Sequence, residues 1–344
     1  MARLVVDMND RRPIWARPEW FERELRDALP DDWSLAMLDA PADGTGDGSA
    51  AAHPSVLEAV SDAEVYLGFG IHPDVITEGP NVRWVHSGSA GVGSSITPPL
   101  RERDPVFTNT AGVHGPPMAE TILGMLLHFF RGFDFAVASQ ARGAWDTSRF
   151  YEADSPVREL AGSTIGIVGY GGIGQELARR LTALGASVLG LRRSAGDAEH
   201  ERVEIVTGAH GFDRILRESD AVVVTAPDTP ETRGMVDSDA FVRMKRDAVL
   251  VNVARGALVV EEDLIEALRG GRIRGAGLDV FTTEPLPGDS PIWSLDNVLI
   301  TPHVSGVTDR FWRREADLIL HNLRCWLAGD REGMRNVVDL DAGY

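Results

Sequence analysis

Two hydrophobic patterns alternate along the second half of the chain. Short apolar runs are typical of buried strands, and the stretches between them carry apolar residues at helical spacing. The expected strands span residues 163–170, 187–193, 221–227, 248–254, 275–280 and 297–303. Because apolar strands separated by helices form parallel sheets covered on both faces, this half predicts a doubly wound α/β domain.

The first hundred residues predict a smaller unit of the same class. Strands are expected at 3–8, 63–70 and 106–112, and the strand beginning at residue 82 runs into a glycine-rich loop. A long buried helix is expected over 116–143, followed by an irregular surface segment. The amphipathic helix at 309–329 is expected to pack back on the first unit. The predicted architecture is a dinucleotide-binding domain (113–306) inserted into a smaller α/β domain (1–112 and 307–344).

Composition narrows the class of protein. A net charge of −18 argues against a nucleic-acid partner, because phosphate binding needs a basic face. The single cysteine, Cys325, allows no disulfide within the chain, and the histidines lack ligand spacing, so no metal site is expected. No apolar run approaches the ~20 residues of a membrane span, and charge interrupts the N-terminal segment too early for a signal peptide. We therefore expect a cytoplasmic protein.

A glycine-rich turn follows the expected strand at 163–170. Gly169, Gly171 and Gly174 have the spacing G-x-G-x-x-G between a strand and a helix. In this context the first glycine permits a tight turn, the second lets the backbone approach a pyrophosphate, and the third allows close helix packing. The helix N-terminus favours the negative charge. The motif predicts a dinucleotide-binding site.

Two arginines stand where the preference between NAD and NADP is set. An NAD site of this kind places an acidic residue ~20 residues beyond the loop, at the end of the second strand. Here Arg192 stands eighteen residues after Gly174, with Arg193 and Ser194 next. Guanidinium groups bind a phosphate bidentately, so these residues predict NADP(H), with NAD(H) possible. The alternative is a solvated basic turn.

Four further titratable residues follow expected strands. Arg255 provides a planar fork suited to a carboxylate and a neighbouring carbonyl. His303 can protonate a forming alkoxide, and Glu284 would pair with that imidazole, fix its tautomer and favour its charged form. Together with Asp279, these motifs resemble the D-isomer-specific 2-hydroxyacid dehydrogenase family, and the likeness extends to "GSAGVG" and "PMAE" in the first half.

The resemblance implies the fold and further site residues. It implies a Rossmann-type cofactor domain, a flavodoxin-like substrate domain and a homodimer formed through the helix 116–141. Backbone amides around Ser89, Ala90, Gly91 and Val92 would hold the substrate carboxylate, and Asp279 would face the nicotinamide carboxamide. The other expected cofactor contacts are Tyr170, Gly172, Ile173, Ala226, Pro227, Thr232, Val253, Ala254, Ser305 and Gly306.

The expected activity is reduction of a small 2-oxo acid, such as glyoxylate or hydroxypyruvate, to the D-2-hydroxy acid. Arg255, Glu284 and His303 are the expected catalytic residues, and Arg255 and His303 also contact substrate. The sequence leaves the side-chain pocket open among Phe69, Trp145, Phe150, Tyr151 and Trp293. The alternative from another class is a nucleotide-sensing interaction protein, as with the corepressors that share this fold.

Overall fold

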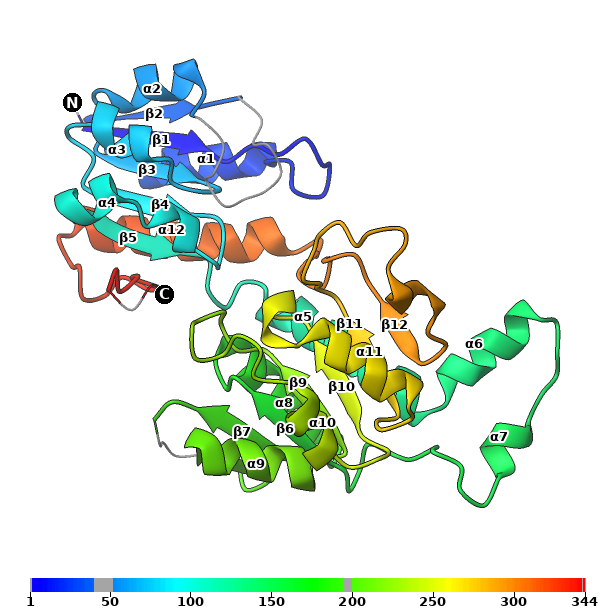
Figure 1. The fold of residues 1–344 in the computed structure, drawn as a ribbon. Helices are drawn as coiled ribbons and strands as arrows, with labels where there is room; N and C mark the ends of the chain where they lie inside the picture. Colours follow the sequence, from blue (N-terminus) through cyan, green and yellow to red (C-terminus); the bar gives the residue numbers. More distant parts are fainter. Residues whose placement is uncertain (1, 40–51, 195–199, 342, 344) are drawn as a thin grey trace. The chain divides into compact units, whose positions relative to one another are not determined.

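The structure is a computed structural model that describes residues 2–39, 52–194, 200–341 and 343 (Figure 1). The chain divides into two compact units. Unit 1 comprises residues 1–114 and 307–344, and unit 2 comprises residues 115–306. The first boundary lies two residues after the expected one at 112/113.

Unit 1 contains a sheet of five parallel strands. Their order across the sheet is β2-β1-β3-β4-β5, which is the flavodoxin-like order. The strands are β1 (Ala2–Asp7), β2 (Trp33–Met37), β3 (Val65–Gly68), β4 (Trp84–Ser87) and β5 (Val106–Asn109). Every neighbouring pair is parallel, so the carboxyl ends of all five strands lie at one edge of this sheet.

Helices cover both faces of the unit 1 sheet. One apolar cluster joins the sheet to α1 (Glu19–Ala28) and α12 (Phe311–Leu327), and it contains Phe21, Trp84 and Phe311. A second cluster covers the opposite face with α2 (Pro54–Val60), α3 (Pro73–Glu78) and α4 (Pro98–Arg103). Consecutive residues of β1 alternate between the two clusters: Leu4 and Val6 belong to the first and Val5 to the second. This alternation is what a strand buried on both faces requires.

Unit 2 contains a second parallel sheet of seven strands. Their order is β12-β11-β10-β9-β6-β7-β8, so the direction of strand addition reverses between β6 and β9. The strands are β6 (Thr164–Val168), β7 (Ser187–Arg192), β8 (Val203–Thr207), β9 (Ala221–Val224), β10 (Val249–Asn252), β11 (Gly275–Leu278) and β12 (Val298–Ile300). A reversal of this kind is where open α/β sheets bind ligands, at the carboxyl ends of the strands.

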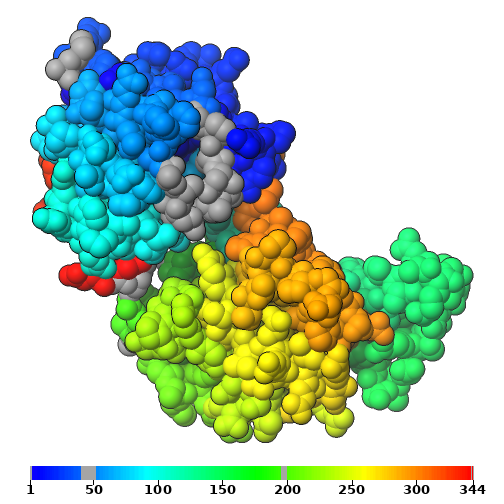
Figure 2. Space-filling model, turned by 45° about the horizontal axis from the view of Figure 1, so that its top comes forward, coloured from blue at the N-terminus to red at the C-terminus, as the bar shows by residue number. Residues whose placement is uncertain are grey.

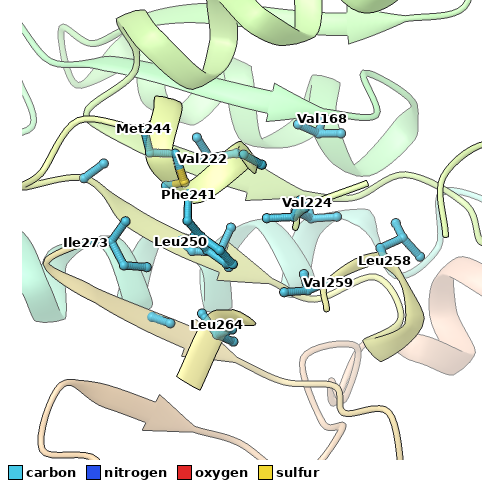
Figure 3. Packing of buried hydrophobic residues seen from close by; sticks show 14 of the residues in the cluster. Val168, Val222, Val224, Phe241, Met244, Leu250, Leu258, Val259, Leu264 and Ile273 are labelled. Carbon is cyan, nitrogen blue, oxygen red and sulfur yellow. The ribbon is translucent and has the colours of Figure 1, made fainter. Parts of the chain in front are cut away.

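Two apolar clusters also sandwich the unit 2 sheet. The helices α5 (Gly115–Phe130) and α8 (Gly172–Ala183) pack on one face. The helices α9 (Gly208–Glu218), α10 (Ser238–Arg243) and α11 (Glu261–Arg269) pack on the other, where Phe241 and Leu264 meet Val222 and Leu250 (Figure 3). Short 3-10 helices η1 (Gly93–Ser95), η2 (Gly256–Leu258) and η3 (Pro291–Ser294) interrupt the loops. The fold confirms the predicted doubly wound α/β class.

The single long helix expected over 116–143 is wrong. The chain forms α5 and then α6 (Phe133–Ala141), separated by a 73° bend. Gly132, at the break, has a φ of 69°, in the left-handed region that ends helices. A short helix, α7 (Ser148–Tyr151), follows, and α6 and α7 stand out from the rest of unit 2 (Figures 1 and 2). Among the described residues no single helix is long and apolar enough to cross a membrane; only the bent pair α5 and α6, counted together, meets that test.

Besides α7 and the three 3-10 helices, two strands and two helices were not predicted from the sequence. Strands β2 and β8 lie at sheet edges, where one or both faces are partly exposed, and neither has the continuous apolar run of a central strand. Helices α3 and α4 span six residues each, too few to show an amphipathic period. Both begin with a proline, which is favoured in the first turn of a helix.

We predict that alanine has opposite effects on stability at two glycines. Gly277 faces α5, whereas Gly124 lies in α5 and faces open space. A Cβ on Gly277, in β11, would lie 2.9 Å from Met125 Cβ and 3.0 Å from its Cγ. Because α5 packs directly on this strand, Gly277→Ala should destabilise the protein by about 1–3 kcal/mol through overpacking. Gly124 lies within α5, and a Cβ there meets nothing within 4 Å. Gly124→Ala should therefore stabilise the helix by up to ~1 kcal/mol.

Thermal unfolding of both variants beside the wild type measures this contrast. A lower Tm for Gly277→Ala and an unchanged or higher Tm for Gly124→Ala are expected. Equal Tm values for the two variants would contradict the close approach of α5 to β11.

Candidate active site

The predicted residues of unit 2 gather at one edge of its sheet. They follow the carboxyl ends of β6, β7, β9, β10, β11 and β12, and all of these strands are parallel. Strands that run the same way end at the same edge, so residues far apart in sequence come to adjacent positions there. This edge is the candidate active site.

The three glycines of the loop after β6 have three different environments. Gly169 has a φ of 102°, and a Cβ there would lie 2.5 Å from the backbone nitrogen of Ala226. A Cβ on Gly174 would lie 2.8 Å from the carbonyl oxygen of Gly169. At Gly171, the residue before α8, a Cβ would meet nothing within 4 Å. The first and third glycines are therefore required by packing, whereas the second leaves open space at a helix N-terminus, which suits a pyrophosphate.

The residues between these glycines have distinct positions. Tyr170 is buried, with its ring against Gly190, and its N–H donates to the carbonyl of Leu191 at 2.8 Å. Gly172 is exposed at the start of α8, and Ile173 is half-buried. Tyr170 thus joins the loop to β7, and the exposed backbone of the first turn of α8 remains open to a ligand.

Arg192 is the last residue of β7 and is half-buried, while Arg193 and Ser194 are exposed. Arg192 forms no ion pair with any carboxylate in the described part of the chain. A hydrogen bond from Thr229 and, to a smaller extent, the charge of Arg193 hold the pKa of Glu231 below its usual value. The two arginines therefore stand at the end of the strand that neighbours the glycine loop, as the sequence predicted.

The segment after β9 braces the glycine loop. The hydroxyl of Thr225 donates to the carbonyl of Gly169 at 2.8 Å, and Ala226 packs beneath the same glycine. Thr232 closes its own turn: its hydroxyl donates to the carbonyl of Pro227 at 2.6 Å and accepts the N–H of Thr229 at 2.9 Å. Thr225 was not predicted, although its place one residue before Ala226 at a strand end is a usable signal.

Arg255 is exposed in a tight turn after β10, while Val253 and Ala254 before it are buried. The guanidinium Nη1 donates to the carbonyl of Ala254 at 2.7 Å. The next residue, Gly256, lies directly against the backbone of Phe281 and Thr282, with no room for a Cβ. The turn that carries the arginine therefore rests on the segment between β11 and Glu284.

His303 and Glu284 form a close pair. The imidazole Nδ1 lies 2.7 Å from Glu284 Oε2, and Glu284 Oε1 accepts the N–H of Phe281 at 2.9 Å. His303 has a left-handed φ of 54°, and its N–H donates to the carbonyl of Asp279 at 2.8 Å. A carboxylate at Nδ1 keeps the proton on that nitrogen and leaves Nε2 to exchange a proton with a ligand. The imidazole is about half exposed and the carboxylate about one-third exposed, so the pair is accessible to a ligand.

The carboxylate of Asp279 is fully buried and holds the loop that carries His303. Its Oδ1 accepts the hydroxyl of Thr301 at 2.5 Å and the N–H of Val304 at 2.9 Å, and its Oδ2 accepts the N–H of Ser305 at 3.0 Å. This organising contact was not predicted from the sequence, and neither was the part of Thr301. The expected contact of Asp279 with a nicotinamide remains a prediction. Gly306 follows Ser305 and ends unit 2.

The predicted carboxylate-binding loop belongs to unit 1. The hydroxyl of Ser89 donates to the carbonyl of Phe69 at 2.7 Å, and the carbonyl of Ala90 accepts the amide of Asn109 at 3.1 Å. Ala90 and Gly91 are exposed and their N–H groups donate to no other described residue, whereas Val92 is buried. The loop thus presents two open amides on a braced turn. Asn109, which braces it from the end of β5, was not predicted.

The structure separates the five aromatic residues considered for the side-chain pocket. Phe69 is buried in unit 1, where its ring lies against Gly88 beside the loop just described. Trp145, Phe150 and Tyr151 belong to the segment of α6 and α7, and Trp293 is half exposed in η3. Of these five residues, only Phe69 therefore lies beside a predicted ligand-binding segment, the loop of Ser89 to Val92 in unit 1.

Comparisons with known proteins identify the family of the chain. Residues 123–305 match the family described as D-isomer specific 2-hydroxyacid dehydrogenase, NAD binding domain. The D-3-phosphoglycerate dehydrogenase of Methanocaldococcus jannaschii is 32% identical over 83% of this chain and 53% of its own length. The hydroxypyruvate reductase of Blautia hydrogenotrophica is 31% identical over 80% of this chain and 85% of its own. The chain spans about half the length of the curated phosphoglycerate dehydrogenases that it matches.

Solved structures of similar proteins cover the whole chain. A D-isomer specific 2-hydroxyacid dehydrogenase from Xanthobacter autotrophicus, in complex with NADPH, has a TM-score of 0.78 and 29% identity, covering 100% of this chain and 99% of that one. An NADPH-dependent glyoxylate/hydroxypyruvate reductase from Sinorhizobium meliloti, in complex with NADP and sulfate, has a TM-score of 0.76 and 29% identity, covering both chains completely. The family match over 183 of 344 residues and these relatives show that this chain belongs to the D-isomer specific 2-hydroxyacid dehydrogenase family.

Proposed function

We propose that this protein is an NADPH-preferring reductase that converts a small 2-oxo acid, such as glyoxylate or hydroxypyruvate, to the D-2-hydroxy acid. The observation that carries this proposal is the 2.7 Å pair of His303 and Glu284 at the same strand edge as the Arg255 turn and the glycine loop. The names of the relatives from Blautia hydrogenotrophica and Sinorhizobium meliloti support the choice of substrate.

The proposed chemistry uses three side chains. The guanidinium of Arg255 binds the substrate carboxylate and polarises the neighbouring carbonyl. His303 donates the proton from Nε2 to the oxygen that becomes the hydroxyl, while Glu284 stabilises the charged imidazole and holds its orientation. A bound nicotinamide cofactor supplies the hydride to C2. The open amides of Ala90 and Gly91 in unit 1 are the proposed second ligand of the carboxylate.

The proposed preference for NADPH rests on the residue at the end of β7. This residue is the half-buried Arg192, free of any described carboxylate, where an NAD site has an acid. Two relatives solved with NADPH or NADP support this choice. An interaction protein that only senses a nucleotide is the rival from another class, and turnover of a 2-oxo acid distinguishes the two.

We also propose that the protein is a homodimer formed through the segment of α6 and α7. Its large apolar residues are exposed: Phe133 by 51%, Val137 by 57%, Trp145 by 97% and Tyr151 by 84%. Exposed apolar groups gathered on a segment that projects from its unit are typical of an interface, and a second copy of this chain is the proposed occupant (Figure 2).

His303→Gln should lower kcat by roughly 10²–10⁴-fold, because glutamine can hydrogen-bond to the substrate but cannot act as a general acid. The dissociation constant of NADPH, measured by fluorescence titration, should change little. His210→Gln is the matched control, since His210 is exposed on α9 and distant in sequence from the site, and it should keep wild-type kcat. A wild-type rate in His303→Gln would refute the assignment of the acid.

The double variant Arg192→Asp, Arg193→Ala should prefer NADH. Charge-assisted hydrogen bonds contribute roughly 1.5–3 kcal/mol each. Losing two of them should raise the KM for NADPH at least about a hundredfold, at ~1.4 kcal/mol per decade. The KM for NADH should stay unchanged or fall, because the new carboxylate can accept a ribose hydroxyl.

Arg246→Asp provides the control for that change of charge. Arg246 is exposed and lies before β10, at the opposite end of the strands from the site. It should leave the ratio of the two KM values within about twofold of the wild type, because exposed charges more than a Debye length apart are largely screened. A wild-type protein that already prefers NADH would contradict the proposal.

Val137→Asp combined with Trp145→Asp should shift the protein from dimer to monomer in light scattering at micromolar concentration, because each change places a charge in the apolar contact. Val242→Asp is the control, since Val242 is 66% exposed but lies on α10. It should remain dimeric. A wild-type protein that is monomeric would overturn the proposed assembly.

A further inference from the structure

Asn252 is buried at the carboxyl end of β10, three residues before Arg255. Both ends of its side-chain amide bind the turn that comes next. Nδ2 donates to the carbonyl of Arg255 at 3.0 Å, and Oδ1 accepts the N–H of Ala254 at 3.1 Å. One planar group therefore fixes the backbone on both sides of the peptide bond that joins Ala254 to Arg255.

The main chain of Asn252 ties the same turn to the loop that carries His303. Its carbonyl accepts the N–H of Asp279 at 3.0 Å, and the carbonyl of Asp279 accepts the N–H of His303 at 2.8 Å. The carboxylate of Asp279 then organises the residues around His303. A continuous set of hydrogen bonds thus runs from the backbone of Arg255, through Asn252 and Asp279, to that of His303.

The position of Arg255 depends on this backbone because its side chain has few other restraints. The residue is exposed, and the one hydrogen bond found for its guanidinium among the described groups is to the carbonyl of Ala254. That carbonyl lies between the two backbone groups that Asn252 binds, the N–H of Ala254 and the carbonyl of Arg255. On the other side, Gly256 is fixed by its contact with the backbone of Phe281. A change in the turn would therefore move the guanidinium, and a displacement of about 1 Å at a substrate-positioning group can cost on the order of a hundredfold in rate.

An asparagine is the side chain that this turn requires. The N–H of Ala254 needs an acceptor and the carbonyl of Arg255 needs a donor. The side-chain amide of asparagine supplies both from one position. Aspartate can accept from Ala254, but its second oxygen would face the carbonyl of Arg255 without a proton between them. Alanine supplies neither group and leaves both backbone atoms unpaired.

We propose that Asn252 is the positioning residue for Arg255, and that it sets where the guanidinium stands relative to the imidazole of His303. This proposal rests on the proposed function for its kinetic test, since it assigns to Asn252 a part in binding the 2-oxo acid. Asn252 does not contact the substrate itself; it acts through the turn.

The kinetic test compares Asn252→Asp with Asn297→Asp. Asn297 is the matched control, because it also lies in unit 2 and also donates from Nδ2 to one main-chain carbonyl, that of Leu268 at 3.3 Å. Asn252→Asp should lower kcat/KM for glyoxylate or hydroxypyruvate on the order of ten- to a hundredfold, while the dissociation constant of NADPH stays within about twofold. Asn297→Asp should change kcat/KM by less than about threefold.

A double-mutant cycle separates positioning from a general loss of stability. If Asn252 acts through Arg255, then Asn252→Asp should cause little further loss of kcat/KM in an Arg255→Ala background, because the group that it positions is already absent. Losses that multiply in the double variant would overturn the proposal. A wild-type kcat/KM in the single variant would overturn it as well.

Hydrogen exchange tests the turn without any turnover. In Asn252→Ala the amide of Ala254 loses its acceptor, so its exchange rate should rise at least about tenfold, while amides in the centre of β6 keep their protection. Unchanged exchange at Ala254 would refute the ordering of the turn. If the wild type reduced no 2-oxo acid, the proposed function would be refuted. The exchange experiment needs no turnover, so it would still decide whether Asn252 orders the turn that carries Arg255.

Discussion

The buried carboxylate of Asp279 is the interaction on which the arrangement of this site depends. Burying a carboxylate is costly unless hydrogen bonds replace its hydration. This one accepts hydrogen bonds from one hydroxyl and two backbone amides of residues 301–305. Those three bonds bend the segment after β12 back over the end of β11. The bend brings His303, with its left-handed backbone, to the pair with Glu284. Without the carboxylate, the two amides would be left without their acceptor and the loop that carries His303 would lose its fixed conformation.

The two acidic residues of this segment show how burial divides their roles. Asp279 and Glu284 are five positions apart, yet one is inaccessible and the other is about one-third exposed. The buried carboxylate is satisfied within the fold and orders the backbone. The exposed one keeps one oxygen on the N–H of Phe281 and turns the other to the imidazole. The same functional group thus orders the fold in one place and, in the proposed mechanism, assists proton transfer in the other, according to its exposure to water.

Much of this architecture could be predicted from the sequence because it follows from local rules. Strands β6, β9 and β10 are continuously apolar because both of their faces are buried. The spacing of Gly169, Gly171 and Gly174 reflects steric limits that act within a few residues. The break at Gly132 was missed because a glycine within an apolar helical pattern is tolerated as often as it ends a helix. The edge strand β8 was missed because partial burial weakens its pattern. The tasks of Asn252 and Thr301 depend on partners from other strands, and no local pattern shows which carbonyl or carboxylate a polar side chain will meet.

The closeness of Gly256 to the backbone of Phe281 also has a consequence for protein engineering. Substitutions around Arg255 meet limits on both sides, since Asn252 supplies two hydrogen bonds to the turn and Gly256 has no room for a Cβ. A larger residue at Gly256 would have to displace the backbone of Phe281, so substitutions there would cost stability. Diversity is better introduced at the loop of Ala90 and Gly91, where both residues are exposed and the hydrogen bond from Asn109 acts on the main chain alone.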